Sequence, residues 1–215
     1  EWLKSEGSDE RVRIVFCHDT RHFSKDFAEL CADIATKIGA DVYLFNNHKA
    51  TPVMSFAIRE LNCHAGVMIT ASHNPYHDNG YKVNFSDGAA IIPPHTEGII
   101  ERVNSISTEQ FDPLPKPEQG TLSPVPDIVE EEYLDRVKSL VLQPDLVNQN
   151  NSLKIVFTAL HGTGGVHVPQ LLNDLGFQCE TVTEQDSPDG RFPTVDSPNP
   201  ENGPALKMGI ELAES

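Results

Sequence analysis

The chain has 215 residues, of which 38% are hydrophobic and 22% charged, so it can fold into one or two domains. Its 16 Lys and Arg residues against 32 Asp and Glu residues give a formal charge of -16. This charge argues against a protein that binds nucleic acid or an anionic membrane, and an anionic ligand would need a local basic cluster or a metal ion. No run approaches the ~18 apolar residues of a membrane span, and no signal peptide is visible, so we expect a cytoplasmic protein.

The four cysteines lie far apart in the sequence, and no two of them form a CxxC pair. Cys17, Cys31 and Cys63 fall in apolar segments, where a free cysteine behaves as a small hydrophobic residue. We therefore expect free thiols rather than a disulfide framework or a zinc site.

The first half of the chain alternates strand and helix patterns. A strand is expected at 11–17, and a helix follows between Ser24, the expected N-cap, and Gly39, the expected stop. Thr51 and Pro52 predict the cap and first residue of a second helix. The other elements expected here are strands at 41–45, 65–70 and 81–85 and helices at 53–61 and 96–103. This order predicts an α/β layer with a largely parallel sheet.

The second half begins with a proline-rich segment, 112–126, which is expected to be a loop or linker. A helix is expected at 127–142, with Asp127 as its cap and Glu130 at its third position. A second unit of similar build should then contain strands at 154–160 and 177–182 and helices at 168–175 and 206–212. We predict two successive three-layer α/β domains with mostly parallel mixed sheets, at 1–143 and 144–215, of which the second is incomplete.

The densest group of polar residues is the segment 70–82, TASHNPYHDNGYK, which follows the apolar strand expected at 65–70. Ligands of open α/β sheets lie outside the carboxyl ends of the strands, so this segment is the expected functional site. The alternative is an exposed turn around Asn79 and Gly80, a pair that is typical of hairpins.

Two parts of this segment, Thr70–Pro75 and Asn79–Lys82, resemble the active-serine loop of the α-D-phosphohexomutases, with its T-A-S-H-N-P and N-G-(F/Y)-K pattern. The wording of the motifs is most similar to the phosphoglucomutase/phosphopentomutase branch. The resemblance covers most of residues 11–204, and it implies a phosphohexomutase-like first domain and part of a second. Further agreement is found at 19–21, 24, 51–52, 87–89, 160–165, 192–194 and 198–201.

The resemblance implies an intramolecular phosphotransferase that interconverts sugar 1-phosphates with 6-phosphates, or 5-phosphates for pentoses. Ser72 matches the phosphoserine. In the family this residue passes its phosphoryl group to the sugar monophosphate, which becomes a bisphosphate intermediate. The phosphate on the serine also binds Mg²⁺. Lys82 matches a lysine for proton transfer and charge neutralisation, and Arg21 an arginine beside the phosphoserine. His73 and Asn74 are expected to orient the loop and contact the phosphoryl oxygens. Phosphoglucomutase with a glucose 1,6-bisphosphate-type activator is favoured, and phosphopentomutase and glucose-1,6-bisphosphate synthase are the alternatives.

The chain departs from the family pattern at the metal site. The family binds Mg²⁺ through three aspartates of a D-G-D-x-D-R loop, which would follow residue 215. Asp186, Asp189 and Arg191 resemble that loop, but their spacing is wrong and the middle aspartate is missing. The chain also starts without Met and lacks the family's opening segment and its third and fourth domains. We therefore expect an internal fragment, whose partners are the remaining mutase domains and a phosphosugar substrate, and which is inactive alone.

Three other functions compete with this interpretation. A serine hydrolase would need a base for Ser72, but the neighbouring His73 should point away, and His161 would have to be brought close by the fold. A dinucleotide-binding module is suggested by the glycines of 162–165, although His167 occupies the third glycine position of the fingerprint. A noncatalytic relative that binds phosphosugars without turning them over is the third.

Overall fold

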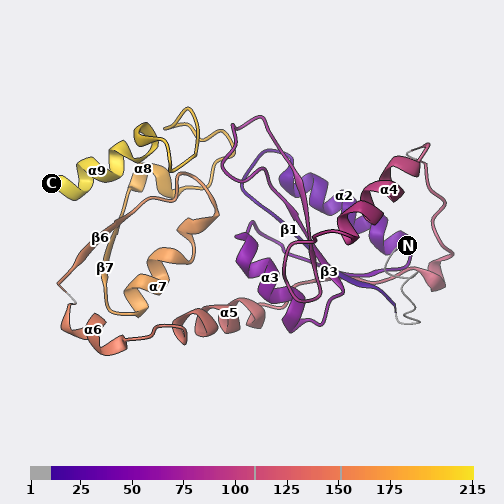
Figure 1. Cartoon of the computed structure of the whole chain (residues 1–215), viewed down its shortest axis with the longest axis horizontal. Coiled ribbons are helices and arrows are strands. Elements are labelled where there is room, and N and C mark those ends of the chain that lie inside the picture. Colours follow the sequence, from indigo (N-terminus) through magenta and orange to yellow (C-terminus); the bar gives the residue numbers. More distant parts are fainter. Residues whose placement is uncertain (1–10, 109, 151) are drawn as a thin grey trace.

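The computed structural model describes residues 11–108, 110–150 and 152–215, which form two lobes joined along one side by two helices (Figure 1). The larger lobe contains β1 (Arg13–His18), α2 (Ser24–Lys37), β2 (Asp41–Leu44), α3 (Thr51–Glu60), β3 (Ala65–Ile69), β4 (Tyr81–Phe85), α4 (His95–Ser105), η1 (Lys116–Glu118) and β5 (Leu122–Pro124). The connection consists of α5 (Ile128–Lys138) and α6 (Pro144–Gln149). The smaller lobe contains β6 (Lys154–Phe157), η2 (Thr163–Gly165), α7 (Val168–Asp174), β7 (Gln178–Thr181), α8 (Thr183–Asp186), η3 (Gly203–Leu206) and α9 (Lys207–Glu214).

The sheet of the larger lobe has the strand order β4-β3-β1-β2-β5. All neighbouring strands are parallel except β3 and β4, which confirms the mixed and mostly parallel α/β class. Side chains alternate between its two faces, so Val15 packs toward α3 and α5 while Phe16 packs toward α2. Helices cover both faces, and every residue of β3 is buried, as expected for the central part of such a sheet.

The predicted stop of α2 is confirmed, but the predicted starts of α2 and α3 are not. Gly39 has φ 97°, its N–H bonds to Thr36 O and the N–H of Ala40 bonds to Ala35 O, which is the expected Schellman ending. Ser24 and Thr51 are not N-caps but the first residues of α2 and α3. The Ser24 hydroxyl instead donates to a carboxylate of the loop before it, and its oxygen accepts from Asn79 Nδ2 rather than from a helix N–H.

The proline-rich segment 112–126 is not wholly a loop, which corrects the prediction. Leu122–Pro124 is β5 and extends the sheet in parallel with β2. Its approach depends on Gly120, because a Cβ at this position would lie 1.7 Å from the carbonyl oxygen of Ala40. A three-residue strand that ends in proline at a sheet edge carries almost no sequence periodicity, so the pattern missed it.

Helix α5 is shorter than the 127–142 predicted, and α6 was missed altogether. Asp127 precedes α5 but makes no side-chain capping bond. The expected capping role of Glu130 is also wrong, because its carboxylate accepts bonds from Lys49 Nζ (2.8 Å) and from His167 Nε2 (2.6 Å). These bonds tie α5 to both lobes. The domain boundary at 143/144, between α5 and α6, stays a prediction.

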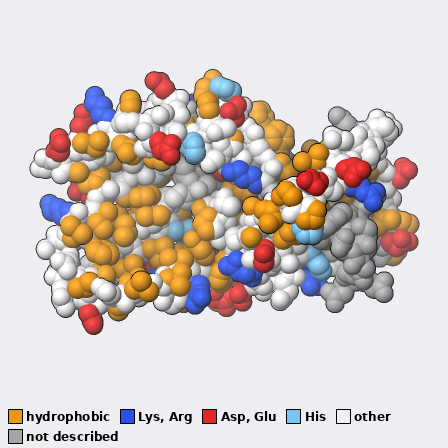
Figure 2. All heavy atoms as spheres, viewed as in Figure 1, with side chains coloured by type: hydrophobic (Ala, Val, Ile, Leu, Met, Phe, Trp, Pro, Cys, Tyr) orange, Lys and Arg blue, Asp and Glu red, His pale blue; other side chains and the backbone are white. Residues whose placement is uncertain are grey.

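The smaller lobe is built on the parallel pair β6 and β7, with α7 against β7 and α9 against β6. The predicted strands and helices are present, but β6 ends at Phe157 rather than at residue 160. No residue of β6, β7 or α7 is fully buried in the part of the chain that the structure describes. Accordingly, Figure 2 shows hydrophobic side chains gathered over this lobe. None of the described helices is long and apolar enough to cross a membrane.

Candidate active site

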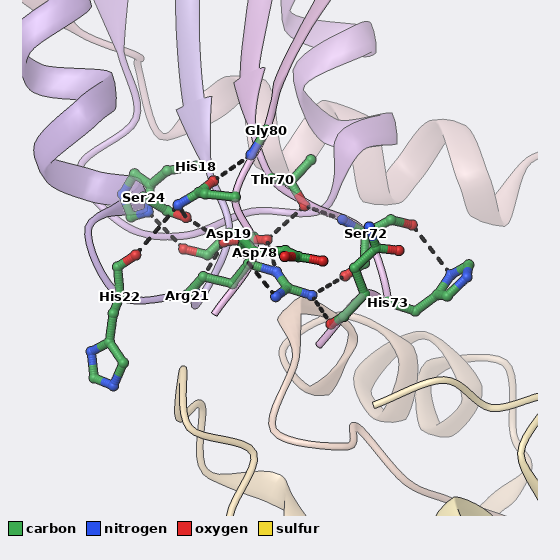
Figure 3. A network of polar contacts seen from close by, with 12 residues as sticks. His18, Asp19, Arg21, His22, Ser24, Thr70, Ser72, His73, Asp78 and Gly80 are labelled. Carbon is green, nitrogen blue, oxygen red and sulfur yellow. Dashed lines mark hydrogen bonds and ion pairs between the residues drawn. The ribbon is translucent and has the colours of Figure 1, made fainter. Parts of the chain in front are cut away.

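The predicted polar segment leaves the buried strand β3 and turns sharply at Ser72, whose φ is 58°. Its N–H donates to the hydroxyl oxygen of Thr70 (2.9 Å), while its own side chain is exposed. Ser72 Oγ lies 3.3 Å from His73 Nδ1, so the expectation that these neighbouring side chains diverge is wrong (Figure 3). The left-handed turn is the cause, because it breaks the alternation of an extended chain.

Arg21 holds this loop in place from the neighbouring strand end. Its guanidinium is almost fully buried, and it donates to backbone carbonyl oxygens of the loop rather than standing free beside Ser72 (Figure 3). The acceptors are the oxygens of Ser72 (2.9 Å), Asn74 (2.7 Å), Pro75 (2.7 Å) and Asp78 (3.2 Å). A planar fork of five donors suits such a set of acceptors, which an ammonium could not satisfy.

Asp19 links Arg21 to the serine turn, and the sequence did not single it out as a site residue. Its Oδ1 accepts from the Arg21 N–H (2.9 Å) and from the Ser24 hydroxyl (2.7 Å). Its Oδ2 lies 3.2 Å from Arg21 Nε and accepts from the Thr70 hydroxyl (2.6 Å), which in turn receives the Ser72 N–H. The carboxylate is therefore fully engaged within the loop network. Its place in the motif Asp19-Thr20-Arg21 was the signal that could have found it.

The far end of the loop is fixed by Asn79 and Gly80. Asn79 Nδ2 donates to the Ser24 hydroxyl (3.0 Å), and its Oδ1 accepts the Gly80 N–H (2.8 Å). A Cβ at Gly80 would lie 2.6 Å from the carbonyl oxygen of Thr70, so the two arms of the loop touch through their backbones. The segment is thus an anchored loop at the end of β3, not a free hairpin turn.

Asn74 and Lys82 occupy different places around Ser72. The Asn74 side chain is exposed, and its backbone is bonded to Ala71 and to Arg21. Lys82 lies on β4 opposite Met68 of β3 and is exposed, and its ammonium makes no hydrogen bond or ion pair with any residue that the structure describes. Because Met68 lines the cleft beside Ser72, Lys82 lies one strand away from the cleft wall.

A cleft of about 410 Å³ separates the two lobes in front of the loop. The larger lobe contributes Ser72 and His73, and the smaller lobe contributes residues that follow β6 and β7. The further lining residues are Asp19, Thr20, Thr51, Met68, Thr70, Phe157, Thr158, Ala159, Leu160, Gly162, Thr163, Gly164, Phe192, Pro198 and Pro200. Ser72 is thus exposed at a cavity of the size that small ligands occupy.

His161 does not face this cleft as a free base. It is buried, with Nδ1 2.9 Å from Ser187 O and Nε2 2.9 Å from Thr194 Oγ1. Since a carbonyl only accepts, Nδ1 carries a proton in the first bond, while Nε2 is paired with the Thr194 hydroxyl. Gln185 Nε2 donates to the same hydroxyl oxygen (2.9 Å). Both ring nitrogens are therefore used to fix the loops of the smaller lobe, which removes His161 as the base of a serine hydrolase.

The described residues do not provide a magnesium site. No group of three or more His, Cys, Asp or Glu side chains that could hold a metal occurs among residues 11–108, 110–150 and 152–215. Asp186 accepts a bond from the Thr181 hydroxyl, and Asp189 is paired with Arg191. Bonds from Arg191 hold the pKa of Asp189 far below its usual range. A phosphate on Ser72 would be a single ligand, whereas Mg²⁺ prefers six oxygens, one or two of them from carboxylates.

Comparison with known proteins matches this architecture. Two family models fit the chain, phosphoglucomutase/phosphomannomutase alpha/beta/alpha domain I at residues 1–110 and domain II at residues 131–215. The phosphoglucomutase of Staphylococcus epidermidis (strain ATCC 12228) is 40% identical over 204 residues, 93% of this chain and 37% of the relative. That of Staphylococcus aureus (strain MRSA252) is 38% identical over 203 residues, 93% of this chain and 36% of the relative. The chain therefore spans little more than a third of these relatives.

Solved structures show the same fold. A putative phosphomannomutase from Thermus thermophilus superposes with a TM-score of 0.77 at 24% identity, covering 99% of this chain and 44% of the other. A phosphoglucomutase/phosphomannomutase family protein from Burkholderia thailandensis gives 0.74 at 23% identity, covering 98% of this chain and 43% of the other. At this identity the likeness concerns the arrangement of the elements.

Proposed function

Because the chain belongs to the phosphoglucomutase/phosphomannomutase family, we propose that it supplies the nucleophile of a sugar-phosphate mutase, with Ser72 as the phosphoryl carrier. Phosphoglucomutase is the proposed activity, since curated relatives at 38–40% identity carry that name. The observation that carries the proposal is the loop itself. Ser72 is exposed at the interlobe cleft, on a turn whose backbone is fixed by Arg21 and Asp19.

Such anchoring suits phosphoryl transfer, in which catalysis is mostly positioning and charge neutralisation. In the proposed step, Ser72 Oγ forms a bond to phosphorus and the bond from phosphorus to a sugar oxygen breaks. The Ser72 hydroxyl loses its proton, and the released sugar oxygen gains one. His73 Nδ1, 3.3 Å from Ser72 Oγ, is within reach of that proton, and the unpaired ammonium of Lys82 is the cation proposed to balance the phosphoryl charge.

The substrate proposed is a sugar monophosphate that becomes a bisphosphate during the reaction. Asn74, which is exposed on the same loop, is proposed to contact its phosphoryl oxygens. Arg21 is proposed to support them indirectly, because its donors are already bonded to the loop carbonyls. Magnesium, a glucose 1,6-bisphosphate-type activator and the third and fourth mutase domains belong to the proposal for the complete enzyme.

The phosphoserine can be tested directly. The complete mutase that contains this segment is incubated with glucose 1,6-bisphosphate and Mg²⁺, and its phosphorylated residue is mapped by mass spectrometry. The expected result is one phosphate on Ser72, removed by the Ser72→Ala substitution without loss of the fold, because the Ser72 side chain is exposed and is not part of the core. A phosphate found elsewhere in the chain would overturn the assignment.

A matched control is available on the opposite wall of the cleft. Thr163 also lines the cavity with a hydroxyl group but follows β6 in the smaller lobe. The Thr163→Ala variant should therefore keep the phosphate on Ser72. A parallel incubation uses ribose 1,5-bisphosphate in place of glucose 1,6-bisphosphate. The bisphosphate that phosphorylates Ser72 faster distinguishes the hexose activity from the phosphopentomutase alternative.

A further inference from the structure

Phe192, in the smaller lobe, is held in an unusual backbone conformation against the larger one. Its φ is 51°, in the left-handed region that bulky residues rarely adopt, and only 4% of the residue is exposed. Its ring centroid lies 5.2 Å from Cζ of Arg21. A strained conformation of this kind persists only when the surrounding structure determines it, and such positions cluster at functional sites.

The Phe192 ring and the loop carbonyls contact different parts of the Arg21 guanidinium. Four carbonyl oxygens and one carboxylate surround the edge of the guanidinium, where its N–H groups point. The planar face of the cation has no hydrogen-bonding capacity, and an aromatic ring is its favoured neighbour. The Phe192 ring thereby excludes water from the cation, which strengthens the bonds that the edge makes to the loop.

The contact is supported by close packing of the backbones beside it. A Cβ at Gly190 would lie 2.6 Å from the backbone nitrogen of His22 and 2.8 Å from the carbonyl oxygen of Thr20. The segment before Phe192 therefore lies directly on the segment that carries Arg21. Within the segment, the Phe192 N–H bonds to Asp189 O, so the ring is presented by a fixed turn.

We propose that Phe192 is a positioning residue for the nucleophile loop and acts through Arg21. The smaller lobe thus controls the order of Ser72, although none of its described residues hydrogen-bonds to the serine loop. When the lobes separate, Phe192 leaves the guanidinium, water reaches Arg21, and the bonds to the carbonyls of residues 72–78 weaken. The catalytic meaning of this coupling rests on the proposed role of Ser72, while the coupling itself does not.

Hydrogen exchange tests the coupling without any assay of activity. In the 215-residue chain, amide exchange of residues 72–80 is measured by mass spectrometry for the wild type and for Phe192→Leu and Phe192→Tyr. Leucine keeps an apolar side chain but has no aromatic face, so exchange of the loop should rise about tenfold. Tyrosine keeps the face and should exchange like the wild type. Equal exchange in the leucine variant and the wild type, or failure of tyrosine to restore protection, would overturn the proposal.

Two controls separate this effect from general loosening. Arg191→Ala removes the exposed neighbour, which pairs with Asp189 in its own turn, and should leave the exchange of residues 72–80 unchanged. Phe192→Asn removes the ring but tolerates a positive φ, so it should match the leucine variant even if backbone strain is relieved. Exchange in β6 and β7 must stay constant in all variants. The rescue by tyrosine is informative even if Ser72 carries no phosphate, so failure of the proposed function and failure of the coupling give different results.

Discussion

Left-handed backbone at residues other than glycine is concentrated around the cleft. Ser72, Leu160 and Phe192 all line it, with φ of 58°, 48° and 51°, and His161 follows with φ 57°. Each costs free energy that neighbouring bonds must offset. Their common effect is to turn side chains away from the paths that extended strands would give them. Strained single residues from both lobes therefore shape the cleft together with residues of regular elements such as Met68 of β3 and Phe157 of β6.

Lys82 is the residue whose proposed role is most open to a kinetic test. Because it is exposed and unpaired within the described residues, its ammonium is available to a phosphoryl group. Lys82→Met should lower kcat of the complete mutase by about 10²-fold or more, the scale of losing a positioned charge-stabilising or proton-transferring group. The measurement is steady-state conversion of glucose 1-phosphate to glucose 6-phosphate.

The control for this variant is Lys25→Met on α2. Lys25 is also exposed, and it pairs with Glu29 one turn along the same helix. The Lys25→Met variant should keep kcat within a factor of two of the wild-type value, because such surface ion pairs contribute little to the stability of the fold. If the two variants behave alike, Lys82 is a surface residue without a part in the transfer.

At the scale of residues, the sequence predicted which segment forms the site but not how its parts contact one another. The pattern around Ser72 is specific, and its position after a buried strand fixed its place at the sheet edge. The bonds from Arg21 to the loop carbonyls could not be predicted from the sequence, because every residue type has a backbone carbonyl. The same holds for Asp19, whose role depends on contacts across 51 residues of sequence.

At the scale of elements, the missed strand β5 provides a sensitive test of the sheet edge. Gly120→Ala should destabilise the larger lobe by about 2–3 kcal/mol, because its Cβ would collide with the backbone of Ala40, which cannot move as a side chain would. The free energy of unfolding is measured in urea by circular dichroism. Gly203→Ala, with no atom within 4 Å of the added Cβ, is the matched control and should be neutral. A neutral Gly120→Ala variant would mean that β5 is not docked as described.

The contact between α5 and α7 should be sensitive to pH. Burial raises the pKa of Glu130, but hydrogen bonds from Lys49 and His167 and their charges lower it further, so the net pKa lies below its usual 4.5. A depressed carboxylate pKa stabilises the folded state above the unfolded value and loses that contribution as the pH falls through the folded value. Glu130→Gln should therefore be about 2 kcal/mol less stable than the wild type near neutral pH, with a difference that shrinks below pH 4.5.

This prediction is checked by urea unfolding of both proteins across the acidic range. Glu131→Gln, an exposed neighbour on the same helix, provides the control and should track the wild type at every pH. A constant difference between Glu130→Gln and the wild type down to the most acidic pH would show that the ionised carboxylate does not make the contact.

Elements with a clear period were predicted well, and those held by tertiary contacts were not. Helix α2 and strand β3 follow from apolar spacing alone. By contrast, the ends of α5 and the existence of β5 depend on partners distant in sequence, such as Lys49 for Glu130. The predicted N-cap at Ser24 was wrong for the same reason, since its hydroxyl bonds to the carboxylate of Asp19, whereas Asp127 does stand at the N-cap of α5.

At the scale of the whole molecule, the two lobes differ in how much of their surface is buried. Both hydrophobic clusters lie in the larger lobe and α5, between Val12 and Val129. The apolar residues buried in the smaller lobe, within the described part of the chain, are Leu160, Val182, Phe192 and Ala205, of which Leu160 and Phe192 face the cleft. Residues 11–142 should therefore contribute most of the free energy of unfolding. Backbone amides of the smaller lobe should exchange their hydrogens faster than those of the larger lobe.

The same distribution predicts that the 215-residue chain folds but has negligible phosphoglucomutase activity. The nucleophile loop is anchored within the stable lobe, so Ser72 should be presented correctly. However, the described residues offer no carboxylate cluster for Mg²⁺, and no Lys or Arg among them lines the cleft to hold the distal phosphate of a bisphosphate. The measurement is a coupled assay from glucose 1-phosphate to glucose 6-phosphate with Mg²⁺ and glucose 1,6-bisphosphate, on a sample whose folding is verified by hydrogen exchange. The full-length Staphylococcus epidermidis phosphoglucomutase serves as the positive control. Turnover in the range of roughly 1–10³ s⁻¹ found for ordinary enzymes would show that the two lobes alone hold the metal and both phosphates.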